Sequence, residues 1–375
     1  MPVNYPYLLT PGPLTTSDSV KEAMLRDWGS RDEAFIAMNR EVRERLVGLV
    51  GGEGAYVCVP LQGSGTFTVE AIIGTLVARD AKLLVLVNGA YGTRMVQIAR
   101  VMGRSVEAIE WPEDRQVDPA VLEARLGEDE GITHVAVVHC ETTSGILNPV
   151  EEVAAVVARS GRLLLIDAMS AFGALRLDAR ETPFAAVAAS SNKCLEGVPG
   201  MGFALVRADV LEAASGNAHS LSLDLYDQWK GFERNGQWRF TPPTHVVAAF
   251  LQALEEHSAE GGVAGRAARY VRNHEVLVEG MESLGFRCLL PKAFQAPIIV
   301  TFHMPADPKF DFAEFYERLS TKGFLIYPGK LTVADSFRIG CIGRIGEVEI
   351  RGALAAIETV LEEMGVHDCA PAVSS

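Results

Sequence analysis

Apolar runs of strand length alternate with helical patterns from about residue 18 to residue 260, and no other feature constrains the fold as strongly. The strand-length runs are 55–61, 82–88, 105–109, 134–139, 163–167, 185–189 and 202–206. The helical patterns are 17–26, 35–50, 66–77, 91–102, 119–126 and 150–160. The run Leu163-Leu164-Leu165-Ile166 is apolar without alternation, as in strands that helices cover on both faces. The pattern therefore predicts an α/β fold with a mostly parallel, doubly wound sheet.

The pattern changes toward the C-terminus. A long helix is predicted from Thr244 to about Leu284, with a break near Gly261-Gly262. The strands expected after it are 297–302, 325–327 and 336–340, and the helices are 312–322 and 346–365. With 375 residues, the chain is long enough for two domains. We therefore expect a large domain over 17–274 and a smaller α+β domain over 275–375.

Charge and cysteine content exclude several classes of protein. The net charge is −14 and no basic run interrupts it, which argues against a nucleic-acid or anionic-membrane surface. The N-terminal residues have neither the basic nor the apolar region of a secretion signal, and no apolar stretch reaches membrane-spanning length. Six scattered cysteines contain no CxxC pair, so neither a metal site nor a disulfide scaffold is expected. A cytoplasmic protein is predicted.

Polar clusters follow two predicted strands, and the carboxyl ends of such strands are where α/β sheets bind ligands. Gln62-Gly63-Ser64-Gly65-Thr66 joins a strand to a helix, and its glycines, hydroxyls and free helical N–H groups suit a phosphate. The alternative for this segment is a plain turn with an N-cap hydroxyl. Asp167 leaves the buried strand 163–167, where it either caps a turn or holds a proton on the ring nitrogen of a ligand.

A third cluster, Ser190-Ser191-Asn192-Lys193-Cys194, precedes a glycine-rich turn. An isolated lysine is ordinarily solvated. A partly buried amine among neutral groups has a lowered pKa, however, and this suits a nucleophile that forms a Schiff base. Lys193 follows Asp167 by 26 residues and is expected in the same crevice.

Several motifs together resemble one family, the 2-aminoethylphosphonate:pyruvate transaminases. These belong to the class V aminotransferases, which have the fold type I of enzymes dependent on pyridoxal 5′-phosphate. The resemblance covers nearly the whole chain. The motifs are Leu8-Leu9-Thr10-Pro11-Gly12-Pro13-Leu14-Thr15-Thr16, Asn88-Gly89-Ala90-Tyr91-Gly92, His139-Cys140-Glu141-Thr142-Thr143-Ser144-Gly145, Ser191-Asn192-Lys193-Cys194-Leu195-Glu196-Gly197-Val198-Pro199-Gly200 and Phe337-Arg338-Ile339-Gly340.

The resemblance implies roles for individual residues. Lys193 would form the Schiff base with the cofactor, Asp167 would pair with the pyridine nitrogen, and Tyr91 would stack on the ring. The remaining residues of the implied cofactor site are Ser64, Gly65 and Thr66 at the phosphate, Thr142 on the hydroxyl side, Met169, Asn192, and Thr241 and Thr244. The last two would reach the phosphate of a partner subunit, so the resemblance implies a homodimer with shared sites.

The implied reaction moves the amino group of 2-aminoethylphosphonate to pyruvate, which gives phosphonoacetaldehyde and L-alanine. Arg338 would bind the phosphonate or the carboxylate through its fork of donors. Pro11 and Gly12 would lie in an N-terminal segment, 1–16, that folds over the site, and Arg31 is a second candidate cation. No metal is implied.

Three alternatives stay open. An alanine:glyoxylate or serine:pyruvate transaminase would share every cofactor residue. A lyase of the same fold would need a mobile nucleophilic cysteine, whereas Cys341 is predicted next to a strand. A non-catalytic binding protein on this scaffold would need a partner module, which the sequence does not reveal.

Overall fold

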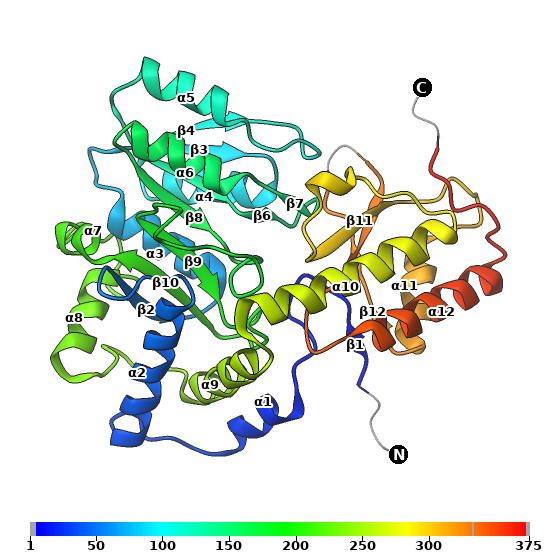
Figure 1. Ribbon diagram of the computed structural model, residues 1–375, viewed down its shortest axis with the longest axis horizontal. Helices are drawn as coiled ribbons and strands as arrows, with labels where there is room; N and C mark the ends of the chain where they lie inside the picture. Colours follow the sequence, from blue (N-terminus) through cyan, green and yellow to red (C-terminus); the bar gives the residue numbers. More distant parts are fainter. Residues whose placement is uncertain (1–4, 332–333, 373–375) are drawn as a thin grey trace.

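A seven-stranded sheet forms the centre of the large domain in the computed structural model, which describes residues 5–331 and 334–372 (Figure 1). The strand order is β2-β10-β9-β8-β5-β3-β4, and β10 alone is antiparallel to its neighbours. The strands are β2 (Tyr56–Gln62), β3 (Lys82–Val87), β4 (Ser105–Glu110), β5 (Ile132–Val138), β8 (Leu163–Asp167), β9 (Ala186–Ser190) and β10 (Met201–Arg207). The predicted α/β fold with a mostly parallel, doubly wound sheet is confirmed.

Helices cover both faces of this sheet, because consecutive strand residues are apolar. In β8, Leu164 and Ile166 pack into one buried cluster, whereas Leu165 between them packs into the other. The helices of the first face are α2 (Glu33–Gly48), α5 (Pro119–Glu128), α6 (Val150–Arg159) and α9 (Thr244–Ala259). Those of the second are α3 (Gly65–Leu76), α4 (Ala90–Val101), α7 (Ala208–Ala213) and α8 (Leu225–Asn235).

The smaller C-terminal domain is built on a three-stranded sheet with the order β11-β14-β13. Its strands are β11 (Ile299–His303), β13 (Tyr327–Pro328) and β14 (Ser336–Gly340), and its helices are α11 (Phe312–Thr321) and α12 (Glu347–Met364). Helix α10 (Gly262–Ser283) runs from the large domain onto this sheet, so Tyr270 packs in the core of the large domain and Leu277 in that of the small one (Figure 1). Residues 332–333, in the β13–β14 connection, lie outside the described residues.

Two element predictions need correction. The expected helix 17–26 is a short α1 (Asp18–Glu22) followed by a 3-10 turn, Ala23–Leu25, in which no residue is buried. The expected strand 325–327 is two pieces in different sheets. β12 (Phe324–Leu325) pairs with β1 (Tyr7–Leu8), and β13 pairs with β14. Ile326 is buried between the pieces, where the chain changes partners.

Other elements were not predicted. They are β1, the hairpin β6 (Cys140–Glu141) and β7 (Ile146–Leu147), the helices α7 and α8, and the 3-10 turn Lys292–Phe294. Helix α8 carried a usable signal, because four of its buried residues repeat at helical spacing, namely Leu225, Gln228, Trp229 and Phe232. The break predicted near Gly261-Gly262 is found between α9 and α10.

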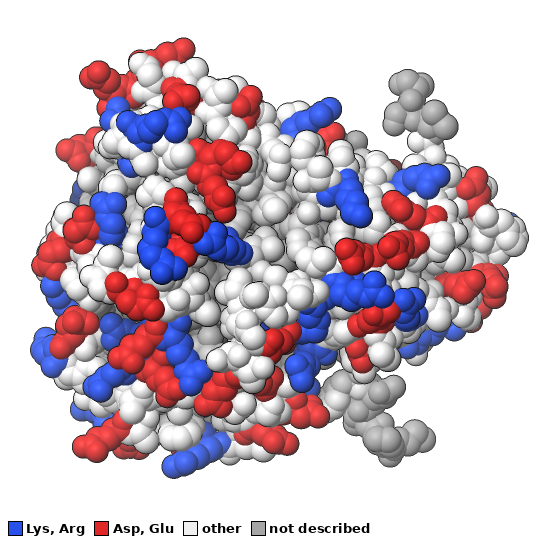
Figure 2. Space-filling model, viewed as in Figure 1, with Lys and Arg blue, Asp and Glu red and all other residues white. Residues whose placement is uncertain are grey.

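Acidic and basic side chains are interspersed over the face shown in Figure 2. None of the helices in the described ranges is both long and apolar enough to cross a bilayer. All six cysteines are free thiols.

Candidate active site

A pocket of about 220 Å³ lies at the carboxyl ends of the parallel strands. Loops that leave β2, β3, β8 and β9 converge on it, as expected for a ligand site in an open α/β sheet. The pocket lining is Gly12, Ser64, Gly65, Thr66, Val69, Tyr91, Arg94, Met95, Asp167, Met169, Ser190, Asn192 and Lys193. Residues predicted from three separate polar clusters therefore meet in one place.

The N-terminus of α3 forms one wall of the pocket. Ser64 is the N-cap residue, and its hydroxyl makes no capping hydrogen bond, which leaves it available to a ligand. Gly65 packs closely against Met169, whose thioether would have to move to make room for a Cβ atom there. Arg94 Nη1 donates to Thr66 Oγ1 over 3.3 Å, so a cation stands beside the free N–H groups of the helix. This donor set suits a phosphate dianion.

Asp167 ends β8 and is buried at the pocket wall. Its Oδ1 accepts the backbone N–H of Met169 over 3.0 Å. Burial raises the pKa of this carboxyl to about 6, while the positive charges of Arg94 and Lys193 act in the opposite direction. A protonated ring nitrogen bound next to this carboxylate would stabilise its negative charge, which burial disfavours.

Lys193 lies in the turn that follows β9. Its Nζ donates to Pro11 O over 2.6 Å and to Gly12 O over 3.3 Å. Burial lowers the pKa of the amine to about 8, and the Asp167 carboxylate opposes that shift. A substantial fraction of the amine is therefore neutral and nucleophilic near neutral pH.

The N-terminal segment packs directly on this lysine. Gly12 has a φ of +108°, and a Cβ atom on it would stand 2.6 Å from Lys193 Cδ and 2.7 Å from Nζ. Only glycine combines this backbone conformation with such an approach. The first four residues of the predicted segment 1–16 lie outside the described part of the chain.

Tyr91 is held at the pocket by a carboxylate that the sequence analysis did not single out. Glu141 is fully buried, and its Oε2 accepts the backbone N–H groups of Tyr91 and Gly92 over 3.0 and 3.3 Å. Its Oε1 accepts the N–H of Thr143 over 3.1 Å. A carboxylate at a helix N-terminus satisfies donors that would otherwise lack partners. Glu141 lies inside the motif 139–145 quoted above, and this position is the signal that could have identified it.

Arg338 lies on β14, buried beside the site. Its Nη1 donates to Thr142 O over 2.6 Å and its Nε to Pro328 O over 3.1 Å. Thr142 is itself buried and does not line the pocket, and its carbonyl orients the guanidinium. Burial lowers the pKa of Arg338.

Six of the predicted residues are not among those that line this pocket, namely Pro11, Arg31, Thr142, Thr241, Thr244 and Arg338. Arg31 is exposed on the turn before α2. Thr241 is exposed and lines a separate pocket of about 100 Å³ beside Phe240, and Thr244 begins α9.

Two cations near Tyr91 were not predicted from the sequence. The Arg94 guanidinium carbon lies 4.8 Å, and Lys330 Nζ 4.5 Å, from the centre of its ring.

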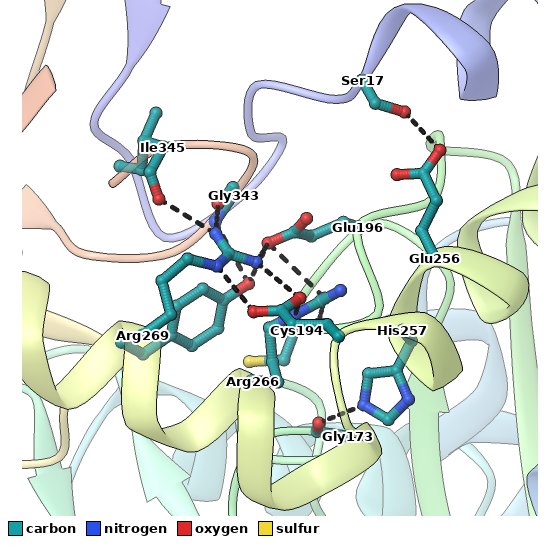
Figure 3. A network of polar contacts seen from close by, with 12 residues as sticks. Ser17, Gly173, Cys194, Glu196, Glu256, His257, Arg266, Arg269, Gly343 and Ile345 are labelled. Atoms are coloured by element: carbon teal, nitrogen blue, oxygen red, sulfur yellow. Dashed lines mark hydrogen bonds and ion pairs between the residues drawn. The ribbon is translucent and has the colours of Figure 1, made fainter. Parts of the chain in front are cut away.

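A buried ionic network fixes the turn that carries Lys193 (Figure 3). Glu196 adopts a left-handed φ of +58° and accepts from Arg269 Nη2 over 2.8 Å and from Tyr270 OH over 2.6 Å. Arg266 donates to Cys194 O, so α10 holds the turn at two points. Arg269 Nη1 continues to the carbonyls of Gly343 and Ile345, beyond β14.

The sequence profile of the aminotransferase class-V family matches residues 17–333, which is most of the chain. The chain belongs to the class-V aminotransferases. Family membership makes it an aminotransferase and implies pyridoxal 5′-phosphate as its cofactor.

Relatives with high sequence identity to this class-V aminotransferase share one name. A 2-aminoethylphosphonate–pyruvate transaminase of Burkholderia lata is 58% identical over 362 residues, which cover 96% of each chain. An enzyme of the same name from Pseudomonas putida is 54% identical, over 97% of this chain and 99% of its own.

Solved structures show the same fold. An aspartate aminotransferase of Thermus thermophilus superposes with a TM-score of 0.86 at 26% identity and covers 96% of this chain and 99% of its own. An alanine–glyoxylate aminotransferase of Nostoc has a TM-score of 0.89 at 25% identity, over 96% of both chains.

The pocket fits the cofactor that the family implies. The Ser190 hydroxyl lines the pocket, is buried and has no hydrogen-bond partner among the described residues, so it is available to a ligand. The helix N-terminus at Ser64 suits the phosphate, Asp167 suits a protonated ring nitrogen, and Lys193 suits the aldehyde carbon.

Proposed function

We propose that this aminotransferase transfers the amino group of 2-aminoethylphosphonate to pyruvate, giving phosphonoacetaldehyde and L-alanine. The observation that carries the proposal is a pocket that combines Lys193, Asp167 and a helix N-terminus, in a chain that is 58% identical to a transaminase of that name. Arg94 and Lys330, which lie over the ring of Tyr91 and form no ion pair among the described residues, support an anionic amino donor.

The cofactor supplies, when bound, a reactive carbonyl and a ring that withdraws electrons. Ser64, Gly65 and Thr66 bind its phosphate, and Asp167 keeps its ring nitrogen protonated. Tyr91 would stack on the ring, with Met169 and Asn192 beside it, while Thr142, which does not line the pocket, would act through Arg338. The neutral Lys193 Nζ accepts the proton that leaves the substrate carbon next to nitrogen and later returns a proton as a general acid.

Arg338 anchors the anionic end of each substrate. Its charge meets no carboxylate in the described part of the chain, because the partners of Nη1 and Nε are neutral carbonyls. The N–H groups of Arg338 that these carbonyls leave free can bind an oxygen of either a phosphonate or a carboxylate. Pro11 and Gly12 close over this end of the site, and Arg31 is a weaker candidate, since it lies outside the pocket.

The assembly belongs to the same proposal. A homodimer would bring the exposed Thr241, together with Thr244, to the cofactor phosphate of the partner subunit. The free thiols suit a cytoplasmic location. We divide the chain into a segment 1–16, a large domain 17–274 and a small domain 275–375, a division supported by the passage of α10 from one core to the other.

Donor screening tests the reaction. Purified holoenzyme is mixed with a single amino donor, and the absorbance of the bound cofactor is followed. We expect 2-aminoethylphosphonate to react fastest among non-product donors, L-alanine to react as the reverse substrate, and Lys193→Ala to convert neither. A wild-type enzyme that reacts with L-serine or with L-alanine and glyoxylate, but not with 2-aminoethylphosphonate, would refute the proposal.

A further inference from the structure

Cations gather near Tyr91 at the edge of the pocket. Arg94 and Lys330 both lie over its ring. Arg338 donates to Thr142 O, next in the chain to the Glu141 that binds the N–H of Tyr91. None of the ion pairs among the described residues includes Arg94, Lys330 or Arg338. The one carboxylate that acts on both Lys330 and Arg338 is Glu141, whose oxygens already accept backbone N–H groups. The protein thus concentrates positive charge where a substrate binds.

Arg338 alone is poorly matched to a doubly charged phosphonate. Its Nε and Nη1 are bound to backbone carbonyls, which leaves Nη2 as the nitrogen with both protons available to a substrate. One such nitrogen suits a carboxylate. The three oxygens of a phosphonate dianion call for a further cation.

Arg94 is assigned to the other end of the pocket. It donates to Thr66 Oγ1 beside the N-terminus of α3, where the residues suit a cofactor phosphate. Lys330 makes no such contact with any of the residues that the structure describes, and its side chain is exposed. It is the cation left for the substrate.

The backbone places Lys330 two residues beyond a carbonyl that binds Arg338. Lys330 follows β13, and Pro328 in that strand supplies the carbonyl that accepts from Arg338 Nε. Gly329 lies so close to Ser336 that a Cβ atom would collide with the Ser336 carbonyl, so β13 is held tightly against β14. Partial desolvation and the charges of Arg94 and Arg338 lower the pKa of Lys330, an effect that a bound dianion would reverse.

We propose that Lys330 binds the phosphonate group of the amino donor together with Arg338, and that it selects a doubly charged donor over carboxylate donors. This inference rests on the proposed function. It assigns different tasks to the two cations. Arg338 serves both substrates, whereas Lys330 serves the phosphonate alone.

The test compares two half-reactions of the holoenzyme by stopped-flow absorbance. In Lys330→Gln we expect the second-order rate constant for 2-aminoethylphosphonate to fall about 10- to 100-fold, the loss typical of a charged hydrogen bond. The constant for L-alanine should change by less than about threefold, since a carboxylate keeps Arg338. Lys330→Arg should restore most of the loss. Lys292→Gln removes an equally exposed charge of the small domain and should leave both constants unchanged.

A second readout separates this inference from the proposed function. Methylphosphonate should inhibit the L-alanine half-reaction, and its inhibition constant should rise about tenfold in Lys330→Gln while that of acetate stays constant. A wild-type enzyme that does not react with 2-aminoethylphosphonate would refute the proposed function. The inhibition by methylphosphonate would still test whether Lys330 binds a phosphonate. Equal losses for both donors, or no loss for either, would overturn the inference.

Discussion

Lys193 experiences two opposing influences on its ammonium group. Burial favours the neutral amine, whereas the Asp167 carboxylate and the carbonyls of Pro11 and Gly12 favour the charged form. The net result is a pKa of about 8. An amine in this range is neutral often enough to attack a carbonyl and charged often enough to return a proton.

The first prediction concerns the capture of pyridoxal 5′-phosphate by the cofactor-free protein. Because only the neutral amine attacks, the rate constant should rise about tenfold per pH unit and level off near pH 8. In Asp167→Asn the carboxylate no longer raises the lysine pKa, so the plateau should begin at lower pH. Rapid-mixing absorbance across pH 6 to about 10 measures both profiles. A wild-type plateau near the ordinary lysine pKa would contradict the buried position of the amine.

The second prediction concerns Gly12. Its replacement by alanine places a methyl group against Lys193 and strains a backbone φ of +108°, so the segment should move away from the lysine. We expect the free energy of unfolding to fall by about 1–3 kcal/mol. Because Lys193 becomes less buried when the segment moves away, its pKa should rise and the capture plateau should move to higher pH. Gly161→Ala is the matched control, since Gly161 has a φ of +67° and open space around it. A plateau shifted equally in both variants would show that the Gly12 contact has no part in it.

At the scale of secondary-structure elements, the sequence pattern predicted the strands and helices that contain long apolar runs. It missed the elements that only a few contacts define. The strands of the central sheet and α2 to α6 agree with expectation to within a few residues. The antiparallel direction of β10 was not predicted, because strand direction depends on the connection and not on composition. The hairpin β6–β7 has two residues per strand, too few for any period to register.

Helix α10 connects the site to the small domain through Arg269. This arginine bonds to Glu196 in the Lys193 turn, to Glu260, and to the carbonyls of Gly343 and Ile345. Arg344 N in turn donates to Thr15 O, so the N-terminal segment is joined to the same loop. The turn that carries Lys193 is therefore connected through α10 and the loop after β14 to the N-terminal segment, which itself contacts Lys193.

The third prediction tests that connection. Arg269→Met leaves Glu196 buried without its main partner, so the free energy of unfolding should fall by about 3–5 kcal/mol. Arg272→Met, three residues further along α10, removes a surface pair with Glu347 and should cost less than about 1 kcal/mol. Urea denaturation of both variants measures the difference. Equal losses would mean that Glu196 finds another partner, with Arg266 the nearest.

At the scale of the whole molecule, the sequence predicted several residues that line the pocket but not the charged residues around Tyr91. Ser64, Asp167 and Lys193 were predictable because each follows a strand whose carboxyl end meets the others. Glu141 and Lys330 were missed, because they are far from Tyr91 along the chain and only the fold brings them to it. Arg94 lies three residues after Tyr91 in α4 and was also missed. Arg31 was named for its charge alone, and charge carries no information about position.

The surface near β2 bears on the assembly. β2 is an edge strand of the central sheet, and Phe67 and Phe240 are 49% and 46% exposed beside the pocket that Thr241 lines. Exposed aromatic rings next to a residue expected at the cofactor are typical of a face that a second subunit covers.

The fourth prediction follows from that geometry and concerns mixed dimers. Lys193→Ala abolishes the nucleophile, and Thr241→Glu with Thr244→Glu sets negative charge against the cofactor phosphate, so each variant alone should be inactive. If each threonine pair serves the partner's site, a mixed dimer contains one site in which both elements are intact. Random exchange of the two inactive proteins should then restore about a quarter of wild-type turnover, since half of the dimers are mixed and one of their two sites works. Sedimentation verifies the dimer, and turnover after unfolding and refolding the mixture measures the recovery. If both threonines served their own chain, no site in the mixture would be complete and no activity would return.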